Sequence, residues 1–258
     1  MDNQRLNITI FGGGNVATHL AKKLLKLPQI NLQQMYNRHI NSIKNFENDT
    51  AIIDDLSKLQ PADIFILALK DEAITPFSKK LQDFDTLTVH TSGSVAMQDI
   101  QTTRKGVFYP FQTFSKNKPE IDFLNIPILI EANNKPDLDL LKHLAIKLSN
   151  KVQIVDSNQR KALHIAGVFA ANFVNYMYQQ AADILQEQGL SFDLVKPLIL
   201  EVAQKVQSLP PDQAQTGPAS RGDLKTIEKH LEFLRQSPKY ELYHYLTELI
   251  LKADDNKA

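Results

Sequence analysis

Residues 6–17 read LNITIFGGGNVA, a β-rich run followed directly by three glycines and the start of a helical pattern. Apolar residues then recur at helical spacing up to Pro28. Within this strand–turn–helix, Gly12, Gly14 and Ala17 have the spacing G-x-G-x-x-A that is typical of dinucleotide-binding turns. The segment therefore predicts an α/β domain that binds a dinucleotide.

Each position of this turn has a physical role. Gly12 permits the tight turn out of the strand, and Gly14 lets a pyrophosphate approach the backbone because it has no side chain. The N–H groups of Asn15 and Val16 then lie at a helix N-terminus, which favours phosphate. We include Gly13 in the expected cofactor site. The alternative is a flexible glycine turn without a ligand, and the flanking strand and helix disfavour it.

The residues at the end of the second expected strand indicate whether the cofactor is NAD or NADP. NAD-binding proteins usually carry an acidic residue there, which binds the ribose 2′-hydroxyl. Here the sequence continues as Asn37-Arg38-His39, without a carboxylate. Arg38 can form a bidentate pair with a 2′-phosphate, so the sequence favours NADP, with Asn37 in the same site. The alternative for Arg38 is an ordinary solvated cation.

Strand and helix patterns alternate up to about Asp156. Strands are expected at residues 6–11, 32–36, 64–69, 86–90, 126–130 and 152–155, and helices at residues 71–81 and 138–148. Beyond Asp156 the patterns are helical, at residues 158–188, 192–208, 224–234 and 240–251. Alternation predicts a doubly wound parallel sheet. We therefore expect a Rossmann domain over residues 1–156 and an all-helical domain over residues 157–258.

Two further strand ends supply polar groups to the same edge of the sheet, where ligands bind in open α/β folds. Ala68 and Lys70 follow one strand, and Ala68 is small enough to lie against a nicotinamide ribose. His90 and Thr91 end the next strand and offer an imidazole and a hydroxyl. The alternatives are a polar turn after His90 and an N-cap role for Asp71.

The helical pattern over residues 158–188 is mostly apolar but has one polar sector. At about 100° per residue, this sector contains Lys161, His164, Asn172, Asn175 and Gln179. Buried polar groups cost free energy unless they have partners. One interpretation is a substrate cleft, in which His164 or Lys161 donates a proton and the two asparagines orient the substrate. The other is a satisfied network between helices.

A second polar cluster spans residues 216–223. Arg221 can either clamp a carboxylate of the substrate or be solvated at the surface. Asp223 is better suited to cap the helix that follows it. The histidines have no metal-ligand spacing, so we expect no catalytic metal.

Composition narrows the class of protein. The 258 residues include 29 basic and 29 acidic side chains, so we expect neither nucleic acid nor a membrane surface as the partner. The chain has no cysteine, which excludes disulfides and thiolate chemistry. No apolar run approaches the roughly 18 residues of a membrane span, and no secretory signal is recognisable. These features predict a soluble, cytoplasmic protein.

Several segments together resemble one family. They are GGGNVA (12–17), NR (37–38), ALKD (68–71), HTSGS (90–94), VFYPFQTF (107–114), LHIA (163–166), ANF (171–173), TGP (216–218) and RGD (221–223). They are similar to bacterial Rossmann-like proteins described as NADP oxidoreductases with a C-terminal helical domain of unknown function. More distantly, the chain is similar to pyrroline-5-carboxylate reductase, deazaflavin-dependent NADP reductase and the 6-phosphogluconate and 3-hydroxyisobutyrate dehydrogenases. The resemblance implies an N-terminal NADP domain, a helical domain that closes the cleft, and a homodimer.

The leading hypothesis is an NADP-dependent oxidoreductase that transfers hydride between nicotinamide and a small carbonyl, hydroxyl or imine substrate. His164 is the expected acid–base group and His90 its rival, with Asn172 and Asn175 orienting the substrate. Lys161 resembles the catalytic lysine of the hydroxyacid dehydrogenases, but Ile165 stands where that motif has asparagine. The alternative is a non-catalytic NADP-binding sensor or dimeric scaffold. A methyltransferase is disfavoured, because Arg38 stands where an acidic ribose-binding residue would be expected.

Overall fold

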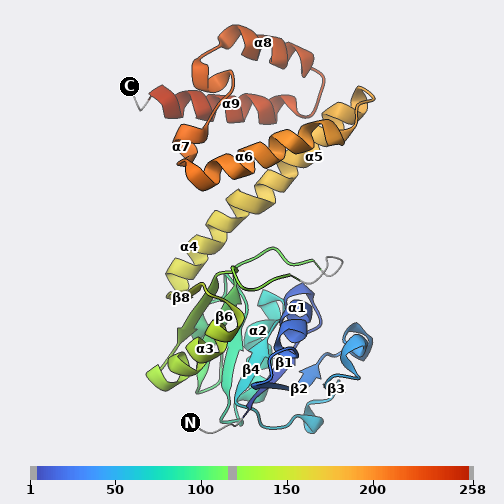
Figure 1. Ribbon diagram of the computed structural model, residues 1–258, viewed down its shortest axis with the longest axis vertical. Coiled ribbons are helices and arrows are strands. Elements are labelled where there is room, and N and C mark those ends of the chain that lie inside the picture. The colour runs from blue at the N-terminus through green and yellow to red at the C-terminus, as the bar shows by residue number, and fades with distance from the viewer. Residues whose placement is uncertain (1–4, 116–120, 256–258) are drawn as a thin grey trace. The chain divides into compact units, whose positions relative to one another are not determined.

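The computed structural model describes residues 5–115 and 121–255 (Figure 1). The chain divides into two compact units, the first ending at Ala171 and the second beginning at Asn172. The first unit contains a sheet with helices, and the second consists of helices. Strands end at the expected place, just before Asp156, but helix α4 (Ser157–Gly167) still belongs to the first unit.

Among the described residues, eight strands form one sheet in the order β3-β2-β1-β4-β5-β6-β7-β8. Neighbouring strands are parallel except β6 and β7, which are antiparallel. The expected doubly wound fold is therefore confirmed, with one antiparallel pair in a mostly parallel sheet. The strands are β1 (Leu6–Phe11), β2 (Ile30–Tyr36), β3 (Ala51–Ile53), β4 (Ile64–Leu67), β5 (Leu87–His90), β6 (Lys105–Pro110), β7 (Ile128–Ala132) and β8 (Val152–Ile154).

Strand β1 lies between β2 and β4, so the strand order reverses at β1. Helix α1 (Asn15–Leu24) leads from β1 to β2 on one side of β1, and after β3 the chain crosses to β4 on the other side of β1. Connections that leave neighbouring strands in opposite directions open a crevice at the carboxyl ends of those strands. The glycine turn at the end of β1 therefore lies at the topological switch point.

The sheet carries an apolar layer on each face. In β4, Ile64 and Ile66 belong to the layer that contains α1 and α3 (Lys135–Leu148). Phe65 and Leu67 belong to the opposite layer with α2 (Asp71–Ser78). All four side chains have no exposed surface. This burial on both faces explains why β4 reads as a continuous apolar run.

A long helical segment links the two units. Asp156 and Gln159 form a capping box at the start of α4, each side chain accepting from the backbone N–H of the other residue. After Gly167, residues Val168–Phe173 are π-helical, and α5 (Val174–Glu187) follows. A π-helix has more residues per turn than an α-helix. The polar sector expected from α-helical geometry therefore does not continue unchanged across this segment.

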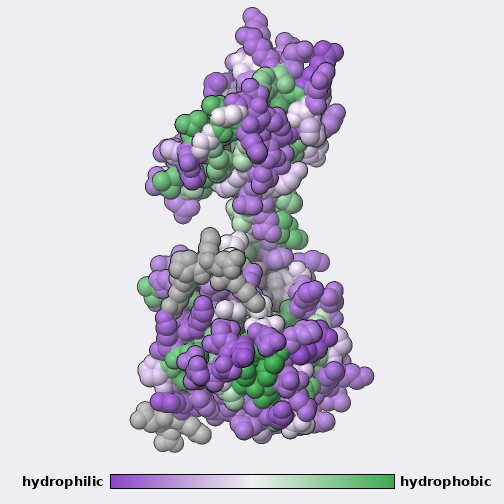
Figure 2. Space-filling model, turned by 90° about the vertical axis from the view of Figure 1, so that its right-hand side faces the viewer, coloured by the Kyte–Doolittle hydropathy of each residue, from purple (hydrophilic) through white to green (hydrophobic). Residues whose placement is uncertain are grey.

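The second unit contains α5, α6 (Lys196–Ser208), α7 (Pro211–Ala214), α8 (Leu224–Phe233) and α9 (Tyr240–Asp255). Helix α9 packs against α8 and against residues 219–221. Large apolar side chains remain exposed here, and Figure 2 shows hydrophobic patches on this part of the surface. On and just before α6, Leu194, Leu198, Leu200 and Val202 are each more than half exposed. Within residues 5–115 and 121–255, no helix combines the length and apolar character needed to traverse a bilayer.

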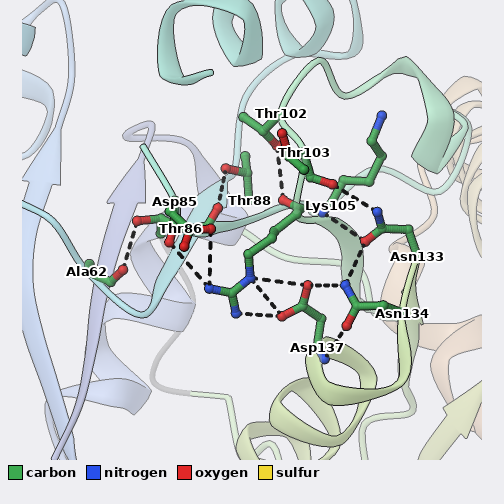
Figure 3. A network of polar contacts seen from close by, with 11 residues as sticks. Ala62, Asp85, Thr86, Thr88, Thr102, Thr103, Lys105, Asn133, Asn134 and Asp137 are labelled. Carbon is green, nitrogen blue, oxygen red and sulfur yellow. Dashed lines mark hydrogen bonds and ion pairs between the residues drawn. The ribbon is translucent and has the colours of Figure 1, made fainter. Parts of the chain in front are cut away.

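A polar network ties the amino ends of β5 and β6 to the first turn of α3 (Figure 3). The Arg104 guanidinium donates to the buried Asp137 carboxylate, with Nη2 2.6 Å from Oδ1. Asn134 caps α3 by accepting from the Asp137 N–H at 2.9 Å, and its own amide donates back to Oδ2. Because the network lies at the edge opposite the carboxyl ends, its role is structural.

Candidate functional site

A cavity of about 850 Å³ lies in the first unit, at the carboxyl ends of β1 and β4. Its lining includes all ten expected cofactor residues and one expected catalytic residue, His164. The ten are Gly12, Gly13, Gly14, Asn15, Val16, Asn37, Arg38, Ala68, Lys70 and Thr91. Residues that are far apart in the sequence, from the glycine turn to His164, thus line the same cavity.

Gly12 makes the turn possible in two ways. Its φ of +125° lies in the region that residues with a side chain rarely adopt. A Cβ at this position would also lie 2.2 Å from the carbonyl oxygen of Ala68. The backbone N–H of Gly12 donates to Tyr36 at 2.9 Å, and that of Ala68 donates to Phe11 at 2.9 Å. The ends of three strands therefore converge on a position that only glycine fits.

Gly13 lies against the turn that follows β2. A Cβ on Gly13 would approach Nδ2 of Asn37 to 2.7 Å. Asn37 is itself held by the donation of its backbone N–H to Ile53 at 3.1 Å, while its Oδ1 accepts from the N–H of His39 at 2.9 Å. The Asn37 side chain thus shapes the turn that carries Arg38.

Gly14 is the N-cap of α1 and faces open space. Nothing lies within 4 Å of the place where its Cβ would be, and no side chain caps the helix. No described residue accepts a hydrogen bond from the N–H groups of Asn15 or Val16. The Asn15 amide instead donates to the carbonyl of Phe114 at 2.9 Å. The helix therefore presents N–H donors and the positive end of its dipole to the cavity, an arrangement that suits a phosphate.

The cavity wall carries charges of both signs. Arg38 is exposed, and no carboxylate of the described residues pairs with it. Lys70 is the N-cap of α2, so the N-cap role expected for Asp71 is wrong by one position. Asp71 and Glu72 occupy the first turn of α2, where carboxylates favour the helix dipole.

His164 reaches the cavity from α4. Its Nδ1 lies 3.0 Å from the hydroxyl of Tyr109, which stands near the end of β6. A Cβ on Gly93 would lie 2.6 Å from both Cγ and Nδ1 of His164, so the imidazole packs directly on the backbone after β5. One turn further along, a Cβ on Gly167 would lie 2.7 Å from the ring of Phe111. Two glycines therefore permit the close approach of α4.

His90, the rival candidate for the acid–base group, does not reach the cavity. Its side chain has no exposed surface and is not part of the cavity lining. Its Nδ1 accepts from the backbone N–H of Ser92 at 3.1 Å. Burial, followed by the positive charge of Arg160, lowers the pKa of His90 to about 3. The imidazole is therefore neutral near pH 7 and holds the turn that leads to Thr91.

The remaining expected residues lie elsewhere. Lys161 is exposed on α4 and is not part of the cavity lining. Asn172, Asn175 and Arg221 are exposed residues of the second unit. Asp223 caps α8 as expected, accepting from the backbone N–H of Thr226 at 3.2 Å.

Sequence reasoning assigned no role to Tyr109 or to the buried Arg160. Arg160 donates to the carboxylate of Glu131, and its Nη2 donates to the carbonyl of Val95 at 2.5 Å. Ser157 joins this network by donating to Glu131 at 2.9 Å. Arg160 lies one turn before His164, and that spacing is the only signal in the sequence that joins the two residues.

Comparisons with known proteins agree with this architecture. A domain of unknown function, DUF2520, matches residues 126–250. A Bacteroides fragilis structure with the provisional description NADP oxidoreductase is 40% identical. The match covers 97% of this chain and 100% of that chain, with a TM-score of 0.88. No curated protein matches the sequence.

Two more distant structures share the fold. Protein TM1727 from Thermotoga maritima is 20% identical, with a TM-score of 0.80 over 96% of this chain and 99% of that chain. A reductive aminase from Aspergillus terreus, in complex with NADPH and ethyl levulinate, is 15% identical. Its TM-score is 0.70 over 98% of this chain and 95% of that chain.

Proposed function

Because the chain belongs to the family of Rossmann-like proteins that are provisionally described as NADP oxidoreductases and carry a C-terminal DUF2520 domain, we propose that its cavity binds NADP(H). We further propose that the protein reduces or oxidises a small carbonyl, hydroxyl or imine substrate. The observation that carries the proposal is the glycine turn, with a Gly12 that admits no side chain and uncapped N–H donors beyond Gly14.

These groups fit a dinucleotide. The open space before Gly14, Asn15 and Val16 suits a pyrophosphate, because the helix dipole and two N–H groups that have no acceptor among the described residues favour a negative charge there. Arg38, exposed on the cavity wall and without a carboxylate partner among the described residues, suits the 2′-phosphate that distinguishes NADP from NAD. Ala68 and Thr91, which directly follow β4 and β5, also line the cavity.

NADP(H), when bound, supplies or accepts the hydride of such a reaction. His164 is then the group that holds or receives the proton, because it is a titratable side chain on the cavity wall with one ring nitrogen free of described partners. We assign this role to His164 rather than His90, since His90 has no exposed surface. The roles of Lys161, Asn172, Asn175 and Arg221 rest on the sequence and stay proposals. Imine substrates draw support from the reductive aminase that shares the fold.

Fluorescence titration with NADPH and NADH tests the cofactor. The wild-type protein is expected to bind NADPH more tightly than NADH. Arg38→Ala should weaken NADPH binding at least tenfold and leave NADH binding nearly unchanged, since a charge-assisted pair contributes roughly 1.5–3 kcal/mol. Lys44→Ala is the matched control, because Lys44 is an exposed cation a few positions after Arg38 in the sequence and does not line the cavity.

Turnover separates the enzyme from a scaffold. NADPH oxidation in the presence of a panel of small ketones, aldehydes and imines, and its loss in His164→Ala with NADPH binding retained, would support the oxidoreductase. NADPH binding without turnover of any substrate in the panel would favour the sensor or scaffold. Binding of neither nucleotide would overturn the proposal.

The helical unit is proposed to hold two copies of the chain together. It leaves Leu194, Leu198, Leu200 and Val202, on and just before α6, more than half exposed. Exposed apolar surface of this kind marks interaction sites. Sedimentation should therefore give the mass of a dimer, and Leu194→Glu with Leu198→Glu should give that of a monomer. A monomeric wild-type protein at micromolar concentration would contradict the dimer.

A further inference from the structure

We propose that Tyr109 is a positioning residue that fixes His164 in the neutral tautomer whose proton is on Nε2, so that this N–H is presented to the cavity. The inference rests on the proposed function and deepens it, because it names the atom of the site that carries the transferable proton. Tyr109 is the side chain that determines which nitrogen carries this proton.

The contact between the two side chains is direct. The Tyr109 hydroxyl lies 3.0 Å from Nδ1 of His164, and the two rings meet nearly edge to face with centroids 6.1 Å apart. Tyr109 comes from β6 and His164 from α4, and both line the cavity. No described residue forms a hydrogen bond with Nε2 of His164. The ring therefore has one nitrogen engaged by protein and one left for the cavity.

The imidazole is held by its Cβ–Nδ1 edge. A Cβ on Gly93 would lie 2.6 Å from Cγ and Nδ1 and 2.9 Å from Cβ of His164. The backbone after β5 thus packs against the same edge that Tyr109 contacts. On the other flank of Tyr109, the ring of Phe111 lies 6.1 Å away and packs on Gly167 of α4. These contacts keep Nδ1 beside the tyrosine hydroxyl.

The direction of the hydrogen bond follows from the available donors and acceptors. Neutral imidazole has one N–H and one acceptor nitrogen, and the phenol has one O–H. If Tyr109 donates, Nδ1 accepts and Nε2 carries its proton into the open cavity, where water can accept it. If His164 donated instead, the half-buried O–H of Tyr109 would need another acceptor, and no described residue supplies one. That O–H would then depend on water at a half-buried position, whereas the Nε2–H faces the open cavity, so donation by Tyr109 leaves the better hydrated donor unpaired.

The charges around the pair agree with a protonated phenol. Burial and then the negative charge of Asp71, at the start of α2, raise the pKa of Tyr109, while Arg160 on α4 acts in the opposite direction. The net shift is upward, so Tyr109 keeps its proton throughout the range in which an imidazole titrates. The donor that the proposed tautomer requires is therefore present.

Nitrogen NMR tests the tautomer without any substrate. Long-range proton–nitrogen correlation on the full ¹⁵N-labelled chain, at a pH of about 8 where imidazoles are mostly neutral, shows which ring nitrogen carries the proton. The signals of His164, one of seven histidines, are assigned by their loss in His164→Gln. We expect protonated Nε2 and unprotonated Nδ1 in the wild-type protein. In Tyr109→Phe the ratio of tautomers should move toward Nδ1–H by about fivefold, the effect of one net hydrogen bond.

Tyr243→Phe provides the matched control. The Tyr243 hydroxyl lies 2.7 Å from Nδ1 of His230 in the second unit. Its removal should change the signals of His230 and leave those of His164 unchanged.

A proton on Nδ1 of His164 in the wild-type protein would overturn the inference, and so would an unchanged tautomer ratio in a folded Tyr109→Phe. If that variant does not fold, the wild-type tautomer decides alone. Because the measurement is made without nucleotide, its failure is distinct from a failure of NADPH binding, which the titration tests separately.

Discussion

The carbonyl oxygen of Ala68 lies 2.2 Å from the place that Cβ would occupy on Gly12, so the end of β4 closes directly on the turn that leaves β1. A methyl group there would overlap backbone, which cannot move aside like the tip of a flexible side chain. The φ of Gly12, +125°, adds conformational strain for any other residue. The switch point of the sheet therefore depends on this one glycine.

Gly12→Ala is expected to lower the free energy of unfolding by more than about 2 kcal/mol, because steric overlap adds to backbone strain. NADPH binding should be lost as well. Urea unfolding followed by circular dichroism measures the first effect. The control is Gly189→Ala, where φ is +69° but nothing lies within 4 Å of the added methyl. If the two variants lose equal stability, overlap with Ala68 is not the cause.

Arg160→Met should destabilise the first unit by roughly 3–5 kcal/mol, because it leaves the largely buried Glu131 carboxylate without its cation. Adding Glu131→Gln to this variant should recover part of the loss. Thermal and urea unfolding measure both effects.

The contrasting pair is Arg235 with Glu232, whose side chains are each 72% exposed. Arg235→Met is expected to change stability by less than about 1 kcal/mol. An Arg160→Met variant as stable as Arg235→Met would show that the buried pair does not anchor α4.

His90 is expected to make the protein less stable in acid. Its pKa is lowered to about 3 by burial and by Arg160, whereas in the unfolded chain it lies near 6.5. Between these values the unfolded chain binds a proton that the native state does not. The free energy of unfolding therefore falls as pH drops below 6.5, by up to about 1.4 kcal/mol per pH unit.

Urea unfolding at several pH values between about 4 and 7 measures this slope. His90→Asn keeps an acceptor for the Ser92 N–H and should show a shallower dependence than the wild-type protein. The control is His143→Asn, which replaces an exposed imidazole on α3. Equal slopes in wild type and His90→Asn would show that His90 is not a buried neutral group.

Local patterns predicted the parts of the fold that depend on neighbouring residues. Three kinds of feature depend on only a few neighbouring residues: the glycine turn, the buried run of β4 and the helix caps at Asn134, Asp156 and Asp223. The sequence predicted the glycine turn, the buried run and the cap at Asp223, but not the other two caps. The antiparallel pairing of β7 with β6 was not predicted either, because strand direction is set by the path of the chain between the strands.

Contacts between residues that are far apart in the sequence could not be predicted either. Tyr109 and His164 are 55 residues apart, and Glu131 and Arg160 are 29 apart, so no spacing rule joins them. The π-helical segment Val168–Phe173 was missed for a different reason: its residues fit an α-helix equally well by propensity. The sequence therefore predicted ten residues that line the cavity and are proposed to bind the cofactor, but not the side chains that hold His164.

We propose above all that the uncapped N-terminus of α1 receives the pyrophosphate of NADP(H). Gly14 tests it most directly. Its φ of −79° suits alanine and nothing lies within 4 Å of the added methyl, so Gly14→Ala should fold, with a loss of no more than about 1 kcal/mol because alanine is a poorer N-cap than glycine. The methyl would occupy only the open space before the helix. The measurement is the dissociation constant of NADPH for wild type and Gly14→Ala, together with the melting temperature of each. We predict at least tenfold weaker binding by a variant that stays folded at the temperature of the titration, whereas equal affinity, or no binding by the wild-type protein, would contradict this proposal.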